Sequence, residues 1–153
     1  MFTLDSEQAL LDSFRTKDRA HVELSRDVKL PLFVRNYLAW AHPAGGRLFL
    51  VFSVPGGVPT GIVFEREHSG PGVSQMCHWC HSSHGDVALL TAKLSGKKTV
   101  GVYVCADLSC QQRLEDEADR SGRSPLPAWA ALLQRIGQFA NEGLGIDLTA
   151  AGR

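Results

Sequence analysis

Residues 77–110 read CHWCHSSHGDVALLTAKLSGKKTVGVYVCADLSC, and this stretch contains all four cysteines of the chain. Cys77 and Cys80 form a C-x2-C pair, and Cys105 and Cys110 form a C-x4-C pair on the far side of an apolar segment. In a reducing compartment, cysteines paired at short spacing more often hold a metal ion or do redox work than form stable disulfides. Zinc takes four thiolates in a tetrahedron, and a two-residue spacer lets one tight turn present two sulfurs to one ion. The spacing therefore predicts one structural Zn²⁺ held by the four cysteines.

The residues after the first pair predict a hairpin followed by a helix. Strands are expected over 86–94 and 99–104, and a helix is expected over 108–118. Cys105 then ends a strand, and Cys110 lies in the first helical turn. This order of knuckle, hairpin and helix is that of a treble-clef zinc finger. The positive end of the helix dipole stabilises the charge of about −2 that four thiolates leave on a divalent ion.

Three other interpretations of the cysteines remain open at this point. Four unpaired core cysteines are one, although chance rarely produces two short-spaced pairs on either side of a hairpin. A thioredoxin-like redox motif is another, but it needs a C-x-x-C that opens a helix, and the polar residues after Cys80 do not favour one. The third is that a nearby histidine, His78, His81 or His84, replaces one cysteine as a ligand.

Nothing in the sequence indicates catalysis. Four cysteines close the coordination sphere of zinc, whereas a catalytic zinc keeps one position open for water or substrate. The H-E-x-x-H, G-x-S-x-G, P-loop and G-x-G-x-x-G patterns are absent. The acidic residues within 115–119 lie on the expected helix, where a solvated face is the simpler interpretation. We therefore expect no enzymatic activity.

Composition and charge are those of an ordinary globular protein. The 153 residues carry 16 Lys+Arg against 16 Asp+Glu, and 44 % are hydrophobic, so neither a disordered chain nor a protein that coats nucleic acid by bulk charge is indicated. No apolar stretch approaches the roughly 18–20 residues that cross a bilayer. No signal peptide is visible at the N-terminus. We therefore expect a cytoplasmic protein.

The rest of the chain predicts an α+β fold. Apolar residues over 47–54 and 60–65 predict antiparallel strands, while the aromatic-rich stretch 33–40 leaves its secondary structure open. The predicted architecture is an antiparallel β-meander followed by a treble-clef zinc finger, with flanking N- and C-terminal helices. The expected divisions are an N-terminal helix (4–14) and connector within residues 1–29, a zinc-finger domain at 30–145 (meander about 33–66, treble clef about 75–120, C-terminal helix about 127–142) and a tail at 146–153.

Two motifs in this chain resemble those of a known family. Met76-Cys77-x-x-Cys80-His81, then the apolar hairpin and Gly101-x-Tyr103-x-Cys105-Ala106-Asp107-Leu108-x-Cys110, are similar to the C-terminal treble-clef zinc-finger domain of FusB-type elongation-factor-G-binding proteins. Weaker similarity through 34–40 extends the likeness to about residues 30–145. The resemblance implies zinc ligation by the four cysteines and a small cytosolic protein that binds elongation factor G, the translocase of the bacterial ribosome. Resistance proteins of this family free the factor stalled by fusidic acid through binding alone. Those resistance proteins begin with a separate helical bundle before the finger domain. In this chain, only the expected helix at 4–14 and its connector precede that domain.

A partner surface beside the finger requires exposed aromatic and cationic side chains. The candidates are Trp79, Lys93, Lys97, Lys98 and Arg113. Trp79 either projects outward from the knuckle or packs against the hairpin or the upstream sheet, and the lysines either contact a partner or keep a turn soluble. The alternative function is an RNA-binding zinc finger associated with the ribosome, which uses the same four cations. The zero net charge and the scarcity of exposed aromatic residues count against it.

Overall fold

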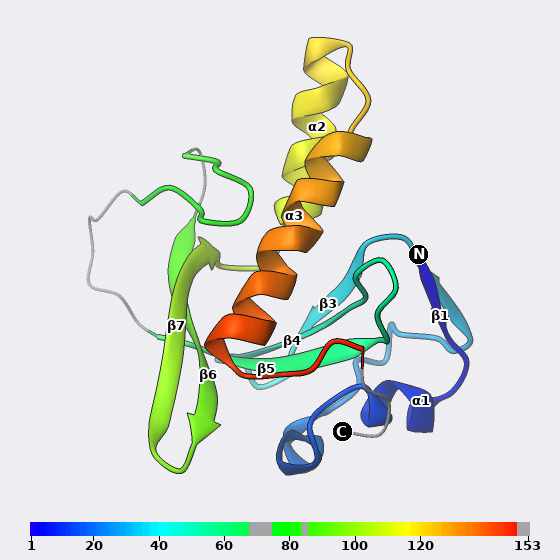
Figure 1. Cartoon of the computed structure of the whole chain (residues 1–153), viewed down its shortest axis with the longest axis vertical. Helices are drawn as coiled ribbons and strands as arrows, with labels where there is room; N and C mark the ends of the chain where they lie inside the picture. Colours follow the sequence, from blue (N-terminus) through cyan, green and yellow to red (C-terminus); the bar gives the residue numbers. More distant parts are fainter. Residues whose placement is uncertain (68–74, 84–85, 150–153) are drawn as a thin grey trace.

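The computed structural model describes residues 1–67, 75–83 and 86–149 (Figure 1). Its strands are β1(Phe2–Leu4), β2(Leu32–Val34), β3(Tyr37–Ala41), β4(Arg47–Phe52), β5(Thr60–Arg66), β6(Val87–Ser95) and β7(Lys98–Cys105). Its helices are α1(Glu7–Asp12), the 3₁₀ helix η1(Thr16–His21), α2(Cys110–Ser121), α3(Leu126–Gln138) and the π-helical turn η2(Phe139–Gly143). Within these residues, no helix is both long and apolar enough to span a lipid bilayer.

Five strands form one antiparallel sheet in the order β3-β4-β5-β6-β7. The upstream meander and the hairpin between the two cysteine pairs are joined where Glu65 pairs with Thr91 and Arg66 with Leu90. The α+β class and the antiparallel strands are thereby confirmed. The hairpin is an extension of the meander rather than a separate unit.

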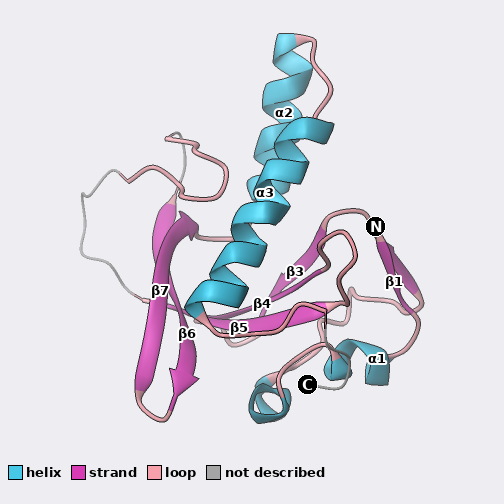
Figure 2. Cartoon of the chain, viewed as in Figure 1, coloured by secondary structure: helices cyan, strands magenta, loops and turns pink. Residues whose placement is uncertain are grey.

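Strand β4 is apolar along almost its whole length because both faces of the sheet are covered. Leu48, Leu50 and Phe52 point into one core, which also contains Leu132 and Ile136 of α3. Phe49 and Val51 point into a second core, which is covered by the N-terminal segment. Successive residues of a strand point to opposite faces, so a strand buried on both sides carries no polar alternation. Figure 2 shows α3 on one side of the sheet and α1 on the other.

The N-terminal segment differs from the helix expected over 4–14. Leu4 belongs to β1, which pairs with β2, and α1 begins only at Glu7 because Ser6 is extended (φ −151°) and its hydroxyl accepts a hydrogen bond from the Ala9 N–H at 3.1 Å. Phe14 follows the helix and is fully buried, with its ring 6.3 Å from Trp40 and 6.4 Å from Phe49 between centroids. Residues 1–29 therefore pack against the sheet as part of its second core.

Phe14 lies directly over Gly61 of β5. The Gly61 N–H donates a 2.8 Å hydrogen bond to the Ser13 carbonyl, and a Cβ atom added at residue 61 would stand 2.6–2.7 Å from three carbon atoms of the Phe14 ring. The absence of a side chain at Gly61 therefore allows the N-terminal segment to approach the sheet.

Gly61→Ala should lower the free energy of unfolding by about 1–3 kcal/mol, because the new methyl group overlaps a ring that the second core holds in place. Urea denaturation measures the loss. Gly143→Ala is the matched control, since its nearest neighbour would lie at an ordinary 3.5 Å. Equal stability of the two variants would contradict the close contact between Phe14 and β5.

Candidate metal centre

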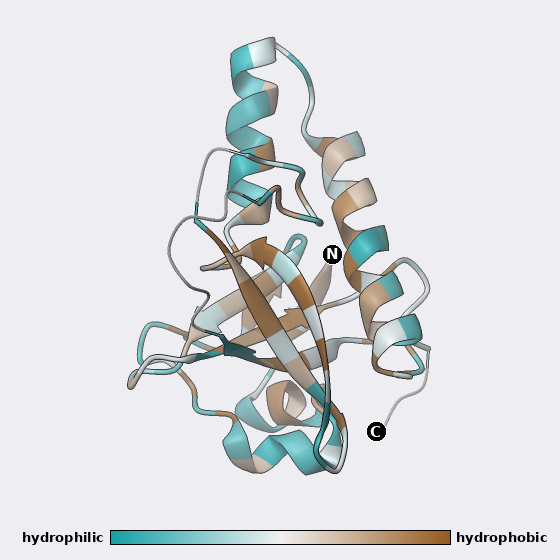
Figure 3. Ribbon diagram, turned by 90° about the vertical axis from the view of Figure 1, so that its left-hand side faces the viewer, coloured by the Kyte–Doolittle hydropathy of each residue, from teal (hydrophilic) through white to brown (hydrophobic). Residues whose placement is uncertain are grey.

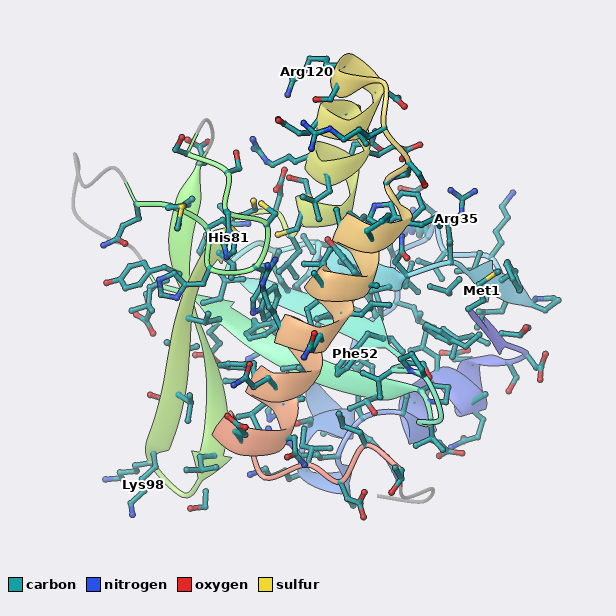
Figure 4. All side chains as sticks on the ribbon, turned by 45° about the horizontal axis from the view of Figure 1, so that its top comes forward. Met1, Arg35, Phe52, His81, Lys98 and Arg120 are labelled. Atoms are coloured by element: carbon teal, nitrogen blue, oxygen red, sulfur yellow. The ribbon has the colours of Figure 1, made fainter. Side chains whose placement is uncertain are left out.

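The four cysteines come together from three places in the fold. Cys77 and Cys80 belong to the knuckle before β6, Cys105 is the last residue of β7, and Cys110 is the first residue of α2. All four are buried, and their sulfur atoms lie within 4.8 Å of one another. Figure 4 shows the yellow sulfur atoms gathered between the loop that carries His81 and the start of α2.

The sulfur positions fit a tetrahedral zinc site. The Sγ atoms of Cys77 and Cys110 are 3.6 Å apart, and those of Cys80 and Cys105 are also 3.6 Å apart. A zinc ion with Zn–S bonds of about 2.3 Å requires sulfur–sulfur separations of about 3.8 Å. Four thiols at this spacing provide the donor set that structural zinc prefers.

Backbone hydrogen bonds shape both turns that present the sulfurs. The His81 N–H donates to the Cys77 carbonyl, and the Leu108 N–H donates to the Cys105 carbonyl, each at 2.9 Å. His81 (φ 61°) and Leu108 (φ 57°) are left-handed, a conformation that costs a residue with a side chain about 1–2 kcal/mol. The Cys80 N–H also donates to Cys77 Sγ at 3.4 Å. The two turns are therefore organised by the backbone around the sulfurs.

The mutual effects of the four cysteines on their pKa values favour a bound cation. Hydrogen bonds from Cys105 and Cys110 lower the pKa of Cys77, whereas contact with Cys105 and Cys77 and burial raise the pKa of Cys110. Without a metal, a thiolate on one cysteine thus opposes ionisation of its neighbours. A divalent ion allows all four to be thiolates, and the N-terminal end of α2 adds its partial positive charge next to Cys110.

Tyr37 of β3 ties the metal centre to the sheet. Its hydroxyl donates to the Leu108 carbonyl and accepts from the Gln111 N–H at 3.1 Å. The Gln111 side chain donates back to the Tyr37 carbonyl at 3.2 Å, and the Trp129 indole of α3 donates to the Gln111 carbonyl at 3.0 Å. Burial raises the pKa of Tyr37, which keeps its hydroxyl a neutral donor. This network joins β3, the start of α2 and α3.

Comparison with known protein families now identifies the fold. The profile described as "FBP C-terminal treble-clef zinc-finger" matches residues 8–142.

The chain belongs to this treble-clef zinc-finger family.

The match confirms the FusB-type resemblance and the treble clef, and it extends the likeness upstream from about residue 30 to residue 8. Together with the cluster of four thiols, it shows that the treble clef holds one structural zinc ion.

Other comparisons give less. No curated protein matches the chain. The solved structure titled "Structure of the fusidic acid resistance protein FusC" is similar with a TM-score of 0.48 and 22 % sequence identity, over 69 % of this chain and 48 % of that one. The chain thus corresponds to about half of the length of that protein.

His78 and His81 lie outside the sulfur cluster of the treble clef. His78 and His81 are exposed, and the His78 ring faces Tyr103 with 6.2 Å between centroids. Among the described residues, the group able to hold a metal consists of the four cysteines. His84 lies outside the described residues.

Trp79 packs inward, so it is not an exposed partner contact. Its side chain is 2 % exposed, and its ring lies 6.0 Å from both Phe64 and Phe139. The Arg135 guanidinium donates to the Trp79 carbonyl at 2.6 Å. Of the two alternatives for Trp79, the structure shows packing against the core. The Trp79 ring thereby holds the knuckle of the treble clef against β5 and the end of α3.

The predicted cationic candidates do not share one surface. Lys97 and Lys98 lie at the far end of the β6–β7 hairpin from the metal centre. Lys98 is seven residues before Cys105 on β7, which corresponds to about 24 Å along a strand. Arg113 lies instead on α2, where its Nε donates to the Ser109 hydroxyl at 3.2 Å. Figure 4 shows Lys98 and His81 at opposite ends of the hairpin.

Sequence reasoning did not find Tyr37 or Arg135. Tyr37 carried a usable signal, because a tyrosine within an apolar strand usually has a partner for its hydroxyl. Arg135 carried none, since its bond to the Trp79 carbonyl joins residues 56 positions apart in the sequence.

Cys105→Ser should abolish stoichiometric zinc binding and unfold the chain. Structural zinc contributes on the order of 10 kcal/mol, which is comparable to the whole stability of a domain. The cysteines belong to the same core as β4, β5 and α3, so the loss should extend beyond the finger. Zinc content and thermal unfolding followed by circular dichroism are the measurements, with the exposed His78→Ala as control. An unchanged melting temperature in zinc-free Cys105→Ser would contradict this.

Tyr37→Phe should lower the free energy of unfolding by about 1–3 kcal/mol while one zinc per chain is retained. The substitution leaves the Leu108 carbonyl and the Gln111 N–H without the hydroxyl that they share. Guanidinium denaturation at fixed zinc concentration measures the change. Tyr103→Phe, at a half-buried position on β7, is the control and should change stability less.

Proposed function

We propose that this chain is a zinc-stabilised protein-interaction module that binds elongation factor G and helps to release it from the ribosome. The observation that carries the proposal is family membership over residues 8–142, together with cysteine motifs that resemble those of FusB-type factor-binding proteins. The action is binding without chemistry. Four cysteines fill the coordination sphere of zinc, so the ion stabilises the surface and takes no substrate.

A groove beside the metal centre is the surface best suited to a protein partner. It has a volume of about 560 Å³ and lies between the knuckle and α2. Its lining residues are Cys80, His81, Ser82, Ser83, Arg113, Leu114, Asp116, Glu117 and Arg120. Charges of both signs on α2 suit a protein surface better than a uniformly anionic backbone. Figure 3 shows that α2 is predominantly hydrophilic.

The zinc end suits the factor contact because the zinc ion holds both walls of the groove in place. Cys80 belongs to the knuckle, which forms one wall, and Cys110 is the first residue of α2, which forms the other wall. A rigid pair of walls binds with less loss of conformational entropy than two mobile segments. A zinc finger that binds RNA through one surface made of Lys93, Lys97, Lys98 and Arg113 has less support. Arg113 lies at the zinc end, whereas the three lysines lie at the opposite end of the hairpin.

The test is co-migration of the purified chain with purified bacterial elongation factor G on a sizing column at tens of micromolar. The natural chain should co-migrate, and it should speed release of the factor from ribosomes stalled with fusidic acid. Asp116→Lys with Arg120→Glu exchanges two charges in the groove without changing the net charge, and it should abolish co-migration. Asp27→Lys with Arg26→Glu makes the same exchange at an exposed loop and should leave it intact. Separate elution of the natural chain and the factor would refute the proposal.

A further inference from the structure

Four of the five lysines of the chain gather at the end of the molecule opposite the metal centre. Lys93, Lys97 and Lys98 lie at the closed end of the β6–β7 hairpin, whereas Lys17 belongs to η1. The Lys17 ammonium donates a hydrogen bond to the Leu94 carbonyl, 77 positions away in the sequence. We call these four side chains the lysine tip. Figure 4 shows Lys98 at the outer end of the hairpin.

Arg15 fixes the two segments of the lysine tip together. Its guanidinium donates to the Lys93 carbonyl at 2.8 Å and forms an ion pair with Asp18 at 2.7 Å. Both Arg15 and Asp18 are largely buried, with side chains 13 % and 8 % exposed. The N-terminal segment is thus held against the hairpin by contacts that leave the four lysines exposed to solvent.

The positive charge of the lysine tip is not neutralised by the acidic groups beside it. Asp18 and Glu65 line the same small cavity as Lys93. Asp18 pairs with Arg15, and Glu65 lies 3.7 Å from Arg47. None of the ion pairs among the described residues involves a lysine of the tip. Because the net charge of the whole chain is zero, the positive charge at this end is balanced by an excess of negative charge in the rest of the chain.

The lysine tip offers charge without an apolar or aromatic surface. In the described part of the chain, the exposed large hydrophobic side chains are Met1, Phe33, Met76 and Leu126, and none belongs to the tip. A protein interface generally has an apolar core, and single-stranded nucleic acid is generally held by stacking on aromatic rings. The phosphate backbone of a duplex requires neither, because Lys and Arg bind it mainly by neutralising phosphates, and the release of condensed counterions favours this binding.

We propose that the lysine tip binds the phosphate backbone of a nucleic-acid duplex, at a surface separate from the groove assigned to elongation factor G. Lysine ammonium groups act as compact point charges toward phosphate oxygens. Contacts from lysines to phosphate oxygens carry no sequence information, so this binding depends on backbone geometry and not on base sequence. RNA and DNA duplexes both offer this chemistry, and the experiment distinguishes them.

Fluorescence anisotropy of a labelled RNA duplex of about 16 base pairs tests the proposal with the full zinc-loaded chain. A DNA duplex of equal length and a poly-glutamate of equal charge are measured in parallel. Neutralisation of three or four phosphates predicts that log K falls against log salt with a slope of about −3. Binding to either duplex with this slope supports the proposal, and preference for one identifies the source of the backbone.

Lys97→Glu with Lys98→Glu should weaken duplex binding about tenfold or more, and Lys17→Glu alone should weaken it severalfold. Arg35→Glu with Arg123→Glu is the matched control, because it changes the net charge equally at two exposed positions outside the lysine tip and outside the lining of the groove. Circular dichroism confirms folding, and Lys17→Ala replaces Lys17→Glu if the latter unfolds. Equal weakening by the control, tighter binding to poly-glutamate, or no binding to either duplex at about 50 mM salt would overturn the proposal. Binding of elongation factor G by the Lys97/Lys98 variant is measured separately. The duplex proposal and the factor-binding proposal can therefore be refuted independently of each other.

Discussion

The coordination of one zinc ion by four thiolates is the constraint on which the rest of the structure depends. It joins a knuckle, the end of β7 and the start of α2 at one point. The centre is part of the core and not an appendage to it, because Trp79 packs on Phe64 and Phe139 immediately beside the ligands. Tyr37 links the same turns to β3, so the metal also orients α2 and α3 relative to the sheet.

Local patterns were enough to predict the centre, while contacts between distant segments were not. The spacing of Cys77, Cys80, Cys105 and Cys110 specifies the ligand set, and the residues between them specify a hairpin. The residues around Trp79 do not predict the direction of its side chain, since that direction depends on a contact with Phe139 of η2, some sixty positions later. The apolar spacing of residues 4–14 predicts a single helix, whereas pairing with β2 holds Leu4 in a strand. Lys17 joins the hairpin lysines only through the tertiary contact to Leu94.

The zero net charge of the chain conceals two ends of different character. The zinc end presents a groove with charges of both signs on α2, and the opposite end presents four lysines. The sheet separates these ends by the length of the β6–β7 hairpin and is stiffened by a core on each face. The two proposed contacts therefore lie at opposite ends, with a protein at the zinc end and a phosphate backbone at the lysine tip.

The coordination shell of the metal tests the central claim most directly. X-ray absorption at the zinc edge of the purified chain should show four sulfur neighbours at about 2.3 Å and no nitrogen or oxygen neighbour. A shell that contains a nitrogen or oxygen atom would contradict the four-thiolate site, and with it the dependence of the knuckle, α2 and their groove on a closed structural centre.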